Sequence, residues 1–88
     1  MNPADYLCEE REISPIDDTG GVARRWRVVY QANGAMHTVV LFRADGQHYA
    51  GQPFLACDCG IERCVHLMAI REQIFAHSAD TPRETGAP

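Results

Sequence analysis

The stretch CDCGIERCVH, residues 57–66, holds three of the four cysteines in the chain and one of its four histidines. Its spacing is Cys-x-Cys, four further residues, then Cys-x-His. Such a cluster can bind a metal ion, form disulfide bonds or take part in thiol redox chemistry. The choice bears directly on the fold, because a chain of 88 residues buries a small core and often depends on a staple.

Metal binding agrees with the local geometry that this spacing imposes. Residues i and i+2 of an extended chain point to the same side, so Cys57 and Cys59 can face one ion from a strand end. In a helix the same spacing turns the side chains about 200° apart. We therefore expect Cys64 just before a helix, His66 in its first turn and Gly60 in the connecting turn. Together, Cys57, Cys59, Cys64 and His66 would complete a tetrahedral, structural Zn²⁺ site.

Disulfide bonds are one alternative, since four cysteines allow three pairings. The N-terminal residues are acidic and lack the apolar run of a secretory signal, so we expect a cytoplasmic protein with reduced thiols. Cys8 lies far from the cluster in sequence and is expected to be a lone thiol. No apolar run approaches the roughly 20 residues of a membrane-spanning helix.

Catalysis is the other alternative, and the pattern disfavours it. A redox pair formed by Cys57 and Cys59 would not require Cys64 or His66. A cysteine–histidine nucleophile needs a cleft and a third, orienting group, for which a domain of this size has little room. We therefore expect a binding module with no enzymatic activity and no small-molecule substrate.

Two β-rich stretches, RRWRVVYQ and MHTVVLF, lie within residues 24–42 and flank Asn33-Gly34. Asn-Gly favours a two-residue hairpin turn, because both central residues must adopt positive φ. Such a turn would place six side chains on one core face, in the cross-strand pairs Tyr30–His37, Val28–Val39 and Trp26–Leu41. Trp26 is therefore expected in the core rather than on a base-stacking surface, and His37 beside Tyr30.

The remaining elements are expected on both sides of this hairpin. A third strand should lie within residues 48–57, after a turn at residues 44–47. Residues 2–12 can form a short helix with Asn2 as its N-cap, or residues 11–16 can pair as an edge strand. Beyond Val65 the apolar residues recur at helical spacing (Leu67, Ile70 and Ile74), which predicts an amphipathic helix that ends near residue 77.

The predicted fold class is a small, zinc-stapled α+β domain. It has an antiparallel β-meander of about three strands followed by one C-terminal helix. Its parts would be an acidic arm at residues 1–21, the zinc-binding domain at residues 22–77 and a disordered tail at residues 78–88.

The chain resembles SWIM-type zinc fingers in the arrangement Cys-x-Cys…Cys-x-His, which follows a short β-meander and leads into the apolar helix Leu67-Met68-Ala69-Ile70. The resemblance covers about Trp26 to Phe75. The four residues between the second and third cysteines are fewer than is usual in that family. The resemblance implies a zinc-binding ββα-type module that binds DNA or another protein.

The charge of −4 is unevenly distributed. Residues 1–19 carry six acids against one arginine, whereas residues 20–77 carry six arginines against four acids. A mildly basic body favours nucleic-acid contact, while the overall negative charge and the acidic arm favour a protein-interaction adaptor. Both hypotheses stay open at this point. The arginines that could contact phosphates are Arg24, Arg25, Arg27 and Arg63.

Overall fold

The computed structural model of the protein describes residues 2–43, 53–61, 64–76 and 83–84. The elements are, in chain order, the 3₁₀ turn η1 (Pro3–Asp5), strand β1 (Tyr6–Arg11), helix α1 (Pro15–Thr19), strands β2 (Val22–Tyr30), β3 (Met36–Phe42) and β4 (Phe54–Cys57), helix α2 (Val65–Ile70), the π-helical turn η2 (Arg71–Phe75) and strand β5 (Arg83–Glu84).

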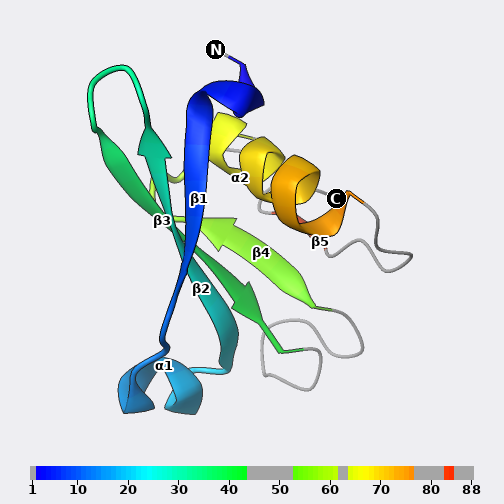
Figure 1. Ribbon diagram of the computed structural model, residues 1–88. Coiled ribbons are helices and arrows are strands. Elements are labelled where there is room, and N and C mark those ends of the chain that lie inside the picture. Colours follow the sequence, from blue (N-terminus) through cyan, green and yellow to red (C-terminus); the bar gives the residue numbers. More distant parts are fainter. Residues whose placement is uncertain (1, 44–52, 62–63, 77–82, 85–88) are drawn as a thin grey trace.

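Strands β1 to β4 form one antiparallel sheet in chain order, and the two-residue β5 pairs parallel to β4. Helix α2 and the following turn lie along one side of this sheet, while α1 lies at the end opposite the β2–β3 hairpin (Figure 1). The α+β class is confirmed. The antiparallel sheet has four strands, however, where the sequence predicted about three.

The additional strand is β1, and the helix expected over residues 2–12 is wrong beyond its first turn. Asn2 does cap η1, since its Oδ1 accepts the Ala4 N–H at 3.0 Å. From Tyr6 onward the chain pairs with β2 as an edge strand instead. Tyr6 is buried at 3% exposure, whereas Leu7 is half exposed. This difference follows from the strand, because successive side chains of a strand point to opposite sides of the sheet.

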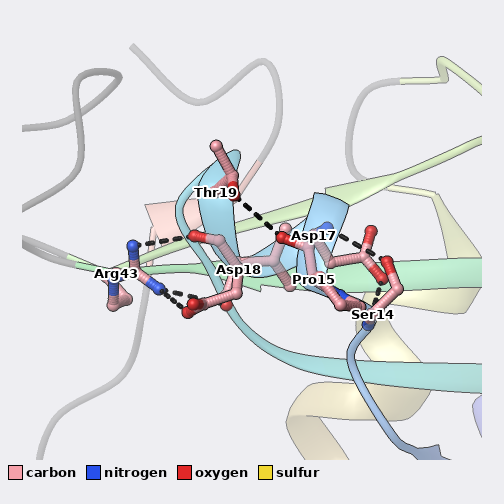
Figure 2. A network of polar contacts seen from close by, with 7 residues as sticks. Ser14, Pro15, Asp17, Asp18, Thr19 and Arg43 are labelled. Carbon is pink, nitrogen blue, oxygen red and sulfur yellow. Dashed lines mark hydrogen bonds and ion pairs between the residues drawn. The ribbon is translucent and has the colours of Figure 1, made fainter.

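The edge strand expected over residues 11–16 is also wrong, because Pro15 begins helix α1. Ser14 and Asp17 form a capping box: the Asp17 N–H donates to Ser14 Oγ at 3.1 Å and the Ser14 N–H to Asp17 Oδ2 at 3.0 Å (Figure 2). Proline suits the first helical position, where no N–H is needed. Arg43 donates to Asp18 Oδ1 at 2.9 Å and so holds α1 against the end of β3 (Figure 2).

The β2–β3 register differs from the predicted one by two residues. Trp26 lies opposite Val39, and Val28 lies opposite His37. The last pair before the loop is Tyr30 with Ala35, joined by a 2.8 Å hydrogen bond, so the loop spans residues 31–34 rather than two residues. Gly34 does adopt positive φ, at 75°.

A shift of two residues preserves the side that each side chain faces. The predicted core face is therefore correct although the pairs are not. Its buried members, fully or nearly excluded from solvent, are Trp26, Val28, Val39 and Leu41. His37 does not lie beside Tyr30, and its actual neighbours are described below.

The core lies between this face of the sheet and α2. Leu55 of β4 is fully buried, as are Leu67, Ala69 and Ile70 of α2. Ile74 and Phe75 of η2 pack against the same cluster, which confirms the predicted apolar face of the helix. Strand β4 confirms part of the expected third strand. The expected turn at residues 44–47, residues 48–52 of that strand, and most of the tail at residues 78–88 lie outside the described residues.

Leu55 and Leu7 provide a matched test of which side of the sheet is the core. Replacing Leu55, which is fully buried, by Ala should lower the free energy of unfolding by about 2–5 kcal/mol, because a cavity remains. Leu7→Ala, at a half-exposed position, should change it by less than about 0.5 kcal/mol. Urea denaturation at equal metal content measures both, and equal losses would contradict the assigned core.

Candidate metal centre

Four donors of the stretch at residues 57–66 converge where β4 ends and α2 begins. Cys57 is the last residue of β4, Cys59 lies in the following turn, Cys64 is the N-cap of α2 and His66 lies in its first turn. Their ligand atoms all lie within 4.8 Å of one another. The structure thus brings together the four residues that the spacing singled out, in the strand-to-helix arrangement that was predicted.

Gly60 permits the tight turn between the strand and the helix. Its φ is 72°, in the left-handed region that other residues rarely adopt. Its N–H approaches the Cys57 carbonyl at 3.4 Å. The chain therefore reverses directly after Cys59, and both cysteines face the start of α2.

The spacing between donors suits a tetrahedral ion. Typical Zn–S and Zn–N bonds place a sulfur and a nitrogen on one tetrahedron about 3.6 Å apart, and Cys57 Sγ lies 3.5 Å from His66 Nδ1. Cys64 and His66 are buried at 6% and 8% exposure, whereas Cys57 and Cys59 are partly buried. The group is positioned to bind a metal ion at the edge of the core.

Backbone N–H groups donate hydrogen bonds to the three cysteine sulfurs. Those of Cys59, Ile61 and Leu67 act on Cys57, Cys59 and Cys64 respectively, and each favours the thiolate. Burial opposes this and raises the pKa of Cys57 and Cys64. For Cys59 the hydrogen bonds outweigh burial and lower the pKa. Burial also lowers the pKa of His66, which keeps the imidazole in its neutral, ligating form.

Two further polar residues, His37 and Asp58, adjoin the four donors, and sequence reasoning missed them. His37 Nδ1 lies 3.0 Å from Asp58 Oδ1, and the His37 ring stacks on His66 with centroids 4.0 Å apart. Asp58 Oδ2 accepts the Thr38 N–H at 3.1 Å, and the Asp58 N–H donates to the Thr38 carbonyl at 3.0 Å. The turn that carries the cysteines is thereby fastened to β3.

Cys8 is separate from this cluster. It lies on β1, and burial raises the pKa of its thiol to about 11. All four cysteines are free thiols in the structure.

Of the predicted phosphate-contacting arginines that the structure describes, Arg24 lies on one side of the sheet and Arg25 and Arg27 on the other. Arg24 donates to Glu10 at 2.6 and 3.1 Å and lies over the Trp26 ring at 4.8 Å, on the α2 side of the sheet. Arg25 and Arg27 alternate with Trp26 along β2 and so face the other side. Arg25 lies 3.5 Å from Asp17. Arg63 lies outside the described residues.

Comparison with known proteins found no matching family model, no matching curated protein and no matching solved structure. Among the helices of the described residues, none has the length and apolar character needed to cross a membrane. The four-donor cluster at residues 57–66 is therefore the main indication of function in the described residues.

Metal affinity at this centre should depend steeply on pH. Because burial raises the pKa of Cys57 and Cys64 above the ordinary thiol value of 9.0, both are protonated near neutral pH in the metal-free protein. An entering ion must displace at least these two protons. We expect its association constant to rise at least about 100-fold per pH unit between about pH 6 and pH 8. Competition with a chromophoric chelator measures this slope, and a pH-independent constant would contradict ligation by the thiols.

Proposed function

We propose that Cys57, Cys59, Cys64 and His66 hold a structural Zn²⁺. The observation that carries this proposal is the convergence of their ligand atoms within 4.8 Å at a strand-to-helix junction. Three sulfurs and one imidazole nitrogen are the donors of a common type of structural zinc site. Four protein ligands complete the tetrahedron and leave no position for a substrate or a reactive water, so we assign the ion no catalytic role.

The role of this zinc is to tie α2 to the sheet. Helix α2 is six residues long before its π-helical turn, and so short a helix is not stable by itself. It supplies the fully buried Leu67, Ala69 and Ile70, which pack on the apolar side of the sheet. Because gathering the ligands also docks the helix, the free energy of zinc binding contributes to the free energy of folding.

Removal of the metal should therefore abolish cooperative folding. We expect the protein in excess chelator, and Cys64→Ser in zinc, to lose the sharp thermal transition of the zinc-loaded protein. Differential scanning calorimetry and native mass spectrometry report the transition and the zinc content together.

Cys8→Ser is the matched control for Cys64→Ser, because Cys8 lies on β1 and outside the four-donor group. It should retain one structural zinc and a cooperative transition. An unchanged melting curve after complete removal of the metal would refute the structural role.

We further propose that the domain is a SWIM-like binding module whose partner is a protein. The side of the sheet opposite α2 supports this, since it combines apolar and cationic side chains. Leu7 of β1 and Met36 of β3 are each paired with Val29 of β2, and Leu7 and Met36 are 50% and 59% exposed. Arg25 and Arg27 lie on the same side. A mixed surface of this kind suits a protein partner better than a polyanion, as does a charge of −4.

Nucleic-acid binding is the second candidate, and the three arginines on this side of the sheet favour it. Arg11 lies directly opposite Arg25 across the β1–β2 ladder, and Arg27 is two residues further along β2. Phosphate contacts by these side chains would make DNA affinity fall steeply with salt.

Salt-dependent DNA binding separates the two candidates. For a protein partner we expect no measurable affinity for duplex or single-stranded DNA by fluorescence anisotropy at low ionic strength. Binding that weakens with salt and is lost in Arg25→Ala and Arg27→Ala would instead establish the nucleic-acid candidate. Arg24→Ala is the matched control, because Arg24 is paired with Glu10 on the other side of the sheet.

A further inference from the structure

The sulfur of Cys57 contacts two polar side chains. His66 Nδ1 lies 3.5 Å away, within the four-donor group. Asp58 Oδ1 also lies 3.7 Å from this sulfur, and His37 Nδ1 lies 3.0 Å from that oxygen. His37, Cys57 and Asp58 thus form a second group whose ligand atoms all lie within 4.8 Å of one another.

The spacing in this second group also suits an ion with borderline ligands. Typical zinc bond lengths place a sulfur and an oxygen of one tetrahedron about 3.6 Å apart, and a nitrogen and an oxygen about 3.4 Å apart. The observed 3.7 Å and 3.0 Å differ from these by a few tenths of an ångström. Because the side chains of His37 and Asp58 are 35% and 52% exposed, an ion and its waters can reach them from solvent.

The charge of the site favours a second cation. Three thiolates and one Zn²⁺ leave a net charge of −1, and the Asp58 carboxylate, beside Cys57, brings it to −2. A second divalent cation would neutralise the cluster.

We propose that His37, Asp58 and Cys57 bind a second Zn²⁺, with the Cys57 thiolate bridging the two ions. This inference rests on the proposed structural zinc, since Cys57 belongs to both groups of donors. The second ion has three protein ligands, one of them shared, and water completes its coordination. It therefore binds more than about tenfold more weakly than the first and exchanges with solvent.

A purely structural role for His37 and Asp58 makes a different prediction. The hydrogen bonds of Asp58 to His37 and Thr38 fasten the turn to β3 whether or not a second ion binds. In that case the protein would take up one Zn²⁺ only, and replacing either residue would change the stability or the affinity of the single site.

The test is a Zn²⁺ titration of the full chain, followed by native mass spectrometry for stoichiometry and by calorimetry for the two affinities. Wild type should bind two ions. His37→Gln keeps a donor for Asp58 but replaces the imidazole by a poor zinc ligand, and Asp58→Asn keeps an acceptor for Thr38 but removes the charge. Both variants should bind one ion and retain the thermal transition of the protein with one zinc. Glu12→Gln, an exposed carboxylate next to β1, is the matched control and should bind two.

The outcomes distinguish this inference from the proposal on which it rests. Uptake of one ion by wild type would overturn the second site and leave the structural zinc in place. Uptake of none would overturn both. Two ions in His37→Gln or Asp58→Asn, as in wild type, would locate the second ion elsewhere and also overturn the inference.

Discussion

The approach of the Cys57 sulfur to the His66 imidazole, at 3.5 Å, joins the last antiparallel strand to the first turn of α2. Much of the remaining structure depends on this junction. The sheet offers one apolar face, with Trp26, Val28 and Val39 fully buried on it, and α2 is the helix that covers that face. Few residues connect β4 to α2, so the position of the turn around Cys59 also sets the position of the helix. Packing of the core and convergence of the four donors are two consequences of one local geometry.

Local rules predicted this junction well, because they need only neighbouring residues. The alternation of side chains in a strand placed Cys57 and Cys59 together, and the helical turn of about 100° per residue placed Cys64 before the helix and His66 inside it. Gly60 adopts the unusual backbone angle expected of it. The same rules identified the buried side of β2 and β3. Side chains of a strand alternate between its two sides, so a register error of two residues leaves each side chain on the predicted side.

The errors concern contacts between distant residues. Nothing local distinguishes residues 6–11 as a strand, because their pattern of acids resembles a solvated helix, and only the exposed edge of β2 makes pairing favourable. The Asn33-Gly34 pair suggested a two-residue turn. The loop is longer: the Gly34 N–H donates to the Tyr30 carbonyl at 2.8 Å, and Asn33 Oδ1 accepts the Ala35 N–H at 2.9 Å. That difference moved the register by two residues and carried His37 from Tyr30 to Val28, within reach of Asp58 and His66.

The register therefore has chemical consequences as well as structural ones. In the predicted pairing His37 would have been an ordinary cross-strand neighbour, whereas in the structure its ring lies against that of His66. Cys57 then belongs to two groups of donors at once. In the proposed two-ion arrangement the ions would not bind independently, because both would share the Cys57 sulfur. The proposed order of loading follows: the ion at the four-donor group would bind first, and the second, more exposed ion would then share its sulfur ligand.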